Sequence, residues 1–147
     1  MLQDAVLNQD EIDALAETMD GQSPRAPKVL LVEGAQKTLG ELVELLRQEG
    51  IAYLIAENLQ KAREALRANK DIDLMITDLR ICNEGSGLDL IRQVRDSGMA
   101  LMPVILVSGE AGVEDAIEAM RLHVVDFFLA PLDLPQLLAV MRAELGI

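Results

Sequence analysis

The sequence has few aromatic residues and almost no cysteine. Aromatic residues make up 2% of the 147 residues, and Cys82 is the single cysteine. Because a disulfide needs two thiols, the chain cannot form an internal one, which fits a reducing, cytoplasmic compartment. No neighbouring His or Lys would activate Cys82, so we expect an unreactive thiol. The core must be aliphatic, since hydrophobic residues make up 50% of the chain.

Positive charge and long hydrophobic runs are also scarce. The formal net charge is -12, from 13 basic and 25 acidic residues. This excess argues against nucleic acid or an anionic membrane as a partner. No apolar run approaches the roughly 20 residues of a membrane-spanning helix, and the acidic N-terminus lacks the basic region of a signal peptide. We therefore expect a cytoplasmic protein whose partners are other proteins.

What the chain does contain is one pattern five times over, a short apolar strand followed by an amphipathic helix. The expected strands are residues 29–32, 51–56, 74–77, 104–107 and 124–129, and helices begin near residues 38, 58, 88, 113 and 133. Continuous apolar runs are typical of strands that are buried on both faces. Strict alternation with short connections predicts an α/β domain over residues 28–147: a five-stranded parallel sheet with helices on both faces.

A separate short amphipathic helix is expected before this domain, in residues 1–21. Asn8 and Glu11 have the spacing of a capping box. The apolar residues that follow recur at helical spacing: Ile12, Leu15, Ala16 and Met19. A helix this short is marginal alone, so we expect it to form when it docks, and a solvated leader is the alternative. Residues 22–27 contain two prolines and are interpreted as a linker.

Polar side chains follow three of the expected strands directly. Glu33 follows the first strand, Asp78 the third and Ser108 the fourth. In an open α/β sheet, ligands bind just beyond the carboxyl ends of the strands, so these side chains are candidates for a site. Taken alone, Asp78 is explained equally well as a strand-end aspartate that begins a loop.

With this order and spacing, residues 28–147 resemble the receiver domain of two-component response regulators, most closely CheY-like single-domain receivers. The matching stretches are Val-Leu-Leu-Val-Glu, Leu-Met-Ile-Thr-Asp-Leu, Gly-Leu-Asp-Leu-Ile, Pro-Val-Ile-Leu-Val-Ser-Gly and Asp-Phe-Phe-Leu-Ala-Pro-Leu. The resemblance implies the strand order 2-1-3-4-5 and a role in phosphorelay signal transduction. It implies that Asp78 is the phosphoacceptor, Ser108 the hydroxyl that senses the phosphoryl group, and Phe127 the switch aromatic beside that hydroxyl.

The sequence departs from this family at two charged positions. The family holds Mg²⁺ with an acidic pair after the first strand, where this chain has Glu33 and Gly34. The lysine that follows the fifth strand in the family is Ala130 here. Because a metal and a cation offset the charge of the transferring phosphoryl group, we expect phosphorylation of Asp78 to be slow, unstable or absent. Glu33 and Asp78 would bind Mg²⁺ weakly at most, and Glu33 is explained equally well as an inherited polar residue.

The stretch of residues 6–15 resembles the N-terminal peptide of flagellar motor switch proteins, the docking site of the phosphorylated chemotaxis receiver. The matching residues are Gln9, Glu11, Ile12, Asp13, Ala14 and Leu15. The resemblance predicts that these residues bind a receiver domain. That domain is either this chain's own, in cis or in a swapped dimer, or a separate chemotaxis receiver. In the chain's own domain, Arg121 and Arg142 on the expected output face are candidate partners for the acids.

Together these features predict a degenerate receiver, not an enzyme, that acts as a protein-interaction module in chemotaxis or flagellar motor control. Any catalysis would be residual phosphoryl transfer to its own Asp78. The alternative is a conventional response regulator that a histidine kinase phosphorylates at Asp78. A third hypothesis is a structural part of the motor switch, in which the N-terminal peptide acts as a competitor.

Overall fold

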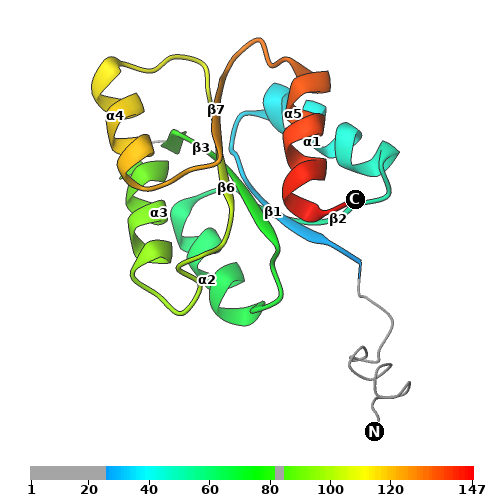
Figure 1. The fold of residues 1–147 in the computed structure, drawn as a ribbon, viewed down its shortest axis with the longest axis horizontal. Coiled ribbons are helices and arrows are strands. Elements are labelled where there is room, and N and C mark those ends of the chain that lie inside the picture. Colours follow the sequence, from blue (N-terminus) through cyan, green and yellow to red (C-terminus); the bar gives the residue numbers. More distant parts are fainter. Residues whose placement is uncertain (1–25, 82–84) are drawn as a thin grey trace, which may run out of the picture.

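Five parallel strands form the centre of the molecule (Figure 1). In this computed structural model, residues 26–81 and 85–147 are described. The strands of the sheet are β1 (Lys28–Val32), β2 (Ala52–Ala56), β3 (Leu74–Asp78), β6 (Val104–Ser108) and β7 (Asp126–Leu129). The helices are α1 (Gln36–Gln48), α2 (Leu59–Ala68), α3 (Gly87–Arg95), α4 (Val113–Arg121) and α5 (Leu134–Leu145). The helix expected in residues 1–21, the linker residues 22–25 and Cys82 lie outside the described residues.

The sheet has the order β2-β1-β3-β6-β7, and every neighbouring pair is parallel. This is the expected order 2-1-3-4-5, because β6 and β7 are the fourth and fifth strands of the sheet. Two short strands that the sequence did not predict, β4 (Arg80–Ile81) and β5 (Gly85–Ser86), pair antiparallel beside it. Strands of two residues are too short to leave a periodic signal in the sequence.

Helices cover both faces of the sheet, as predicted. Alternate residues of each strand point to opposite faces, so Leu30 and Met75 pack under α2 and α3, whereas Leu31 and Ile76 pack under α1 and α5. In Figure 1, α2, α3 and α4 lie on one side of the sheet, and α1 and α5 lie on the other. Both layers are almost purely aliphatic. Within the described ranges, no helix is long and apolar enough to cross a bilayer.

Helix starts follow the expected capping chemistry at two places. The Asn58 side chain accepts a hydrogen bond from the Lys61 backbone N–H at 2.8 Å, and Asp133 accepts one from the Gln136 N–H at 3.1 Å. At α3 the start is set by Ser86, whose hydroxyl accepts a hydrogen bond from the Leu88 N–H at 3.0 Å. The strand expected at 124–129 is shorter and begins at Asp126.

Gly87 allows the first turn of α3 to lie directly against the end of β3. Its N–H donates to the Leu79 carbonyl at 2.8 Å. A Cβ atom at this position would overlap the Asp78 carbonyl oxygen and crowd the Thr77 hydroxyl. Since Asp78 is a candidate site residue, the missing side chain of Gly87 determines where the carboxyl end of β3 lies.

We predict that Gly87→Ala lowers the free energy of unfolding by about 1–3 kcal/mol, because backbone of β3 or α3 must move to admit the methyl group. Urea denaturation followed by circular dichroism measures the change. Gly40→Ala is the matched control: Gly40 lies inside α1, and a Cβ added there would have no neighbouring atom within 4 Å. It should gain about 0.5–1 kcal/mol from helix propensity. Equal effects of the two substitutions would contradict the close approach at Gly87.

Candidate functional site

The carboxyl ends of four strands surround a cavity of about 150 Å³. The register pairs Val32 with Thr77 and Asp78 with Val107. It therefore brings Glu33, the residue that follows β1, to Asp78. Ser108 ends β6, and Ala130 follows β7. All four side-chain positions line the cavity. The structure therefore brings together Glu33, Asp78 and Ser108, as the sequence predicted.

Glu33 is buried, with 2% of its surface exposed. The pKa of its carboxyl group is raised to about 7, chiefly by burial and in smaller part by the charge of Asp78 and a hydrogen bond with the Asp78 side chain. One contact acts the other way: the Ala35 N–H donates to Glu33 Oε2 at 3.0 Å and favours the ionised form. Glu33 therefore tends to keep a proton near neutral pH, and it lies beside a second carboxyl group, that of Asp78.

Asp78 is partly exposed at the end of β3. Its Oδ1 accepts a hydrogen bond from the Arg80 N–H at 3.2 Å, which orients the carboxyl group at the mouth of the cavity. The backbone on either side is held in place, because the Leu79 N–H donates to the Val107 carbonyl at 3.0 Å. The predicted phosphoacceptor is thus both accessible and well oriented.

The Ser108 hydroxyl is engaged within its own loop. It donates to the Glu110 carbonyl at 2.5 Å and accepts from the Glu110 N–H at 3.2 Å. Ser108 is only 5% exposed. The hydroxyl lies in the cavity wall as expected, but a phosphoryl group on Asp78 would compete with the Glu110 carbonyl for its proton.

Phe127 lies away from this cavity. The register pairs it with Leu106, two residues before Ser108. Its ring is partly buried and packs with the core beneath α4, beside Leu122 and Val124. The structure therefore places the expected switch aromatic in the layer that contains α4. Its register partner Leu106 lies two residues before Ser108 on β6.

The cavity has no basic side chain to offset two carboxyl groups. No Lys, Arg or His lines it, and the position after β7 is the methyl group of Ala130. Within residues 26–81 and 85–147, no cluster of three or more His, Cys, Asp or Glu side chains is arranged to hold a metal ion. Mg²⁺ demands near-octahedral oxygen ligands, and here one of only two carboxyl groups retains a proton near neutral pH. The donor set does not fit a tightly bound Mg²⁺.

Two positions at the start of α1 also contribute to this cavity and were missed from the sequence. Thr38 lines the wall, and Ala35 both lines the wall and donates the backbone N–H that Glu33 accepts. A backbone N–H leaves no mark in a residue pattern, and a threonine in the first turn of a helix is an ordinary surface residue. No sequence signal could have identified either of them.

The raised pKa of Glu33 predicts a pH-dependent stability. The folded state keeps a proton that the unfolded state loses above its ordinary pKa of 4.5, so stability falls as the pH rises from about 4.5 to about 7 and stays lower above that range. Glu33→Gln remains neutral, so its unfolding free energy should exceed that of the wild type by about 3 kcal/mol at about pH 8 and by much less at about pH 5. Urea denaturation at both pH values measures the gap.

Exposed Glu64 is the control for this prediction, because it lies on α2 and does not line the cavity. Glu64→Gln should change the unfolding free energy by the same small amount at both pH values. If the difference in unfolding free energy between Glu33→Gln and the wild type does not widen as the pH rises, the raised pKa of Glu33 is contradicted.

Known families, curated sequences and solved structures all include relatives of this chain. The model of the response regulator receiver domain family matches residues 29–142. Among solved structures, a response regulator receiver protein from Pseudomonas putida is 41% identical in sequence and superposes with a TM-score of 0.77. That superposition covers 82% of this chain and 99% of the other.

Curated relatives are transcriptional and response regulators. The chain is 30% identical over 129 residues to the alginate biosynthesis transcriptional regulatory protein AlgB of Pseudomonas aeruginosa, covering 88% of this chain and 28% of AlgB. It is 31% identical over 119 residues to the response regulator protein PilR of the same organism, covering 80% of this chain and 26% of PilR. The chain thus spans about a quarter of the length of these two relatives. With the family model and the sheet order in agreement, the chain belongs to the response regulator receiver domain family.

Proposed function

We propose that this receiver domain is a signalling module that acts through protein contacts, with weak or no phosphorylation of Asp78. The observation that carries the proposal is the buried Glu33 carboxyl group, which faces Asp78 in a cavity that has no basic side chain. Phosphorylation would replace the single negative charge of Asp78 with about two negative charges beside this group. With Ala130 in place of a cation and a poor set of metal ligands, little would offset that charge.

An exposed apolar stripe on α4 supports a role in protein contacts. Val113, Ile117 and Met120 recur at helical spacing and are 76%, 43% and 74% exposed. Leu129 of the neighbouring β7 is 54% exposed. Exposed apolar residues that form a continuous patch are typical of protein interaction sites. The stripe lies on α4, the helix that also carries Arg121 of the expected output face.

The N-terminal residues support a place in chemotaxis or flagellar motor control. Their match to the motor-switch peptide, at Gln9, Glu11, Ile12, Asp13, Ala14 and Leu15, is the basis for this part of the proposal. A segment of this kind would recruit a separate, phosphorylated chemotaxis receiver.

A conventional response regulator is the second candidate function. It is favoured by the accessible, oriented Asp78 carboxyl group and by the curated relatives, which are named as regulators. In this case a histidine kinase would phosphorylate Asp78. The two functions differ in one measurable property, the strength with which the site binds Mg²⁺ and a phosphoryl analogue.

We predict that the wild type shows only weak, unsaturated amide shifts around Asp78 when Mg²⁺ is titrated with or without beryllofluoride. With beryllofluoride present, Gly34→Asp combined with Ala130→Lys should bind Mg²⁺ roughly 10- to 100-fold more tightly, because the new carboxylate is a ligand for the metal and the new lysine offsets the charge of the anion. NMR titration measures both affinities.

The control makes the same changes of charge at the other end of the sheet, with Gly98→Asp combined with Ala68→Lys. Both residues are exposed, and this variant should behave like the wild type. Tight, saturable binding of Mg²⁺ and beryllofluoride by the wild type would overturn the proposal and favour the conventional regulator.

We further predict that deletion of residues 1–21 weakens binding to a phosphorylated chemotaxis receiver by more than tenfold, because apolar anchors such as Ile12 and Leu15 would be lost. Isothermal titration calorimetry measures the affinity. Deletion of residues 1–5, which precede the matching stretch, should leave the affinity unchanged. Unaltered binding after the longer deletion would remove the support for a chemotaxis role.

A further inference from the structure

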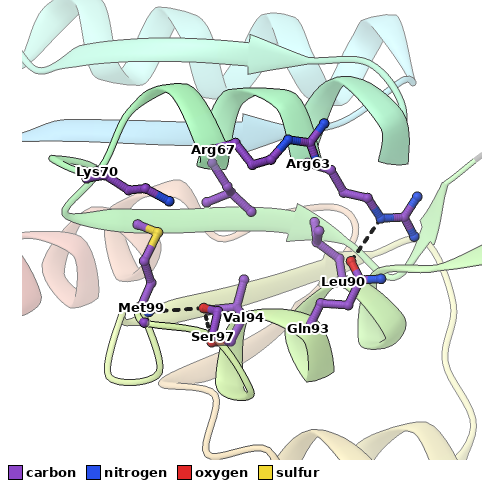
Figure 2. A pocket seen from close by; sticks show the side chains of 10 residues that line it. Arg63, Arg67, Lys70, Leu90, Gln93, Val94, Ser97 and Met99 are labelled. Atoms are coloured by element: carbon purple, nitrogen blue, oxygen red, sulfur yellow. Dashed lines mark hydrogen bonds between the residues drawn. The ribbon is translucent and has the colours of Figure 1, made fainter.

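A groove of about 300 Å³ lies between α2 and α3. Its walls come from the C-terminal parts of the two helices and the turns that follow them, reaching Lys70 on one side and Met99 on the other (Figure 2). These turns lead to the beginnings of β3 and β6. The groove is therefore at the opposite end of the sheet from Asp78 and is separate from the site described above.

The groove combines an apolar interior with a basic rim. In Figure 2, Leu90, Val94 and Met99 lie on the α3 side, and three basic residues lie on the opposite side: Arg63 and Arg67 on α2 and Lys70 just after it. No Asp or Glu lines the groove. In a chain with a net charge of -12, a rim of three cations without a carboxylate is a marked local reversal of charge.

Two of these cations are available to a partner. Arg63 donates to Gln93 Oε1 at 2.8 Å across the groove. Ion pairs in the described ranges occupy Lys28, Arg80, Arg92, Arg121 and Arg142, but they include neither Arg67 nor Lys70. Arg95 is also already hydrogen-bonded, because its guanidinium donates to the carbonyl oxygens of Leu122, Ala100 and Met102. Both Arg67 and Lys70 are exposed.

The first 20 residues of the chain have the complementary composition. They contain six acids and no Lys or Arg: Asp4, Asp10, Glu11, Asp13, Glu17 and Asp20. The apolar residues Ile12, Leu15 and Met19 recur among these acids at helical spacing. An amphipathic segment of this kind matches an apolar groove with a basic rim in both its apolar spacing and its sign of charge.

The first strand begins beside this groove. Lys28 Nζ pairs with Asp71 Oδ2 at 2.9 Å, and the Lys28 N–H donates to Asp73 Oδ2 at 2.9 Å. Asp71 is the next residue after Lys70, which forms the rim of the groove. Residues 22–27 extend at most roughly 20 Å, so the residues before them can reach the groove without crossing the sheet.

Other surfaces suit the N-terminal residues less well. To reach the exposed stripe on α4 and β7, the chain must pass three strand spacings, about 14 Å. Arg121 of α4 pairs with Glu118, and Arg142 of α5 pairs with Glu49. Arg121 and Arg142, the two candidate partners for the N-terminal acids, are thus already paired. The groove between α1 and α5 is lined by Glu41 and Glu44 against a single basic residue, Lys37, so its net charge would repel an acidic segment.

We propose that residues 1–21 dock in the α2–α3 groove of their own chain, with Ile12, Leu15 and Met19 in the apolar interior and the acids on Arg67 and Lys70. Docking in cis would withhold the segment from a partner in trans. A tethered segment sees an effective concentration of order 1 mM, enough to occupy half of a groove with a Kd of about 1 mM. This docking does not depend on the chemistry of Asp78.

The test uses the full-length chain with a nitroxide attached at Thr18→Cys in a Cys82→Ser background. Thr18 is neither acidic nor part of the apolar stripe. We expect the oxidised label to broaden the amide signals of Leu66, Val94 and Met99, and reduction of the label to restore them. Arg67→Glu should remove at least half of this broadening, since reversal of an exposed ion pair weakens binding about three- to tenfold.

Arg47→Glu is the matched control. Arg47 is an exposed residue in the last turn of α1, as Arg67 is in the last turn of α2, but it lies on the other face of the sheet. It should leave the broadening unchanged, and Glu17→Arg should restore the broadening in the Arg67→Glu variant.

Three outcomes would overturn the proposal. Broadening centred on α4 and β7 would place the segment on the output face. Broadening of isotope-enriched chains that carry no nitroxide, when they are mixed with nitroxide-carrying chains at natural isotope abundance, would show docking on a second copy. Equal broadening in Arg67→Glu and Arg47→Glu would show that the basic rim does not hold the segment.

Discussion

The pairing of β1 with β3 is the constraint on which both ends of this molecule depend. Its register, from Val29 with Leu74 to Val32 with Thr77, brings Glu33 to Asp78 at the carboxyl end of the sheet. The same pairing brings Lys28 to the turn after α2 at the other end. A slip of one residue would turn each side chain of β1 to the opposite face. The aliphatic layers on both faces of the sheet hold this register in place.

At the carboxyl end, the receiver architecture is retained but its charge balance is altered. Asp78 is oriented by the Arg80 N–H and Ser108 lies in the wall, so the positions for phosphoryl chemistry are present. The buried Glu33 carboxyl group and the methyl group of Ala130 leave negative charge there without a nearby cation. Phosphoryl transfer depends mainly on electrostatic stabilisation, and this imbalance of charge is the basis for the proposed weak phosphorylation of Asp78.

At the opposite end of the sheet, the charge beside the groove is positive rather than negative. Arg67 and Lys70 bring positive charge to an apolar groove, close to the strand that follows the acidic N-terminal residues. In the proposed function, a receiver domain with a weak phosphoacceptor signals because a partner and an internal segment compete for one surface. The proposed docking and the proposed recruitment are two uses of the same N-terminal residues, and the balance between them would be the regulated quantity.

The sequence by itself determined the α/β class, the five central strands and the residues at their ends, because buried parallel strands and amphipathic helices leave periodic patterns. Asn58 and Asp133 marked helix starts for the same local reason. The tertiary structure alone decided that Glu33 is buried against Asp78, that Ala35 donates to it, that Arg142 is paired with Glu49, and that Arg67 and Lys70 border a groove. Burial, pairing and pKa depend on residues distant in the chain, and no local pattern records which of them meet.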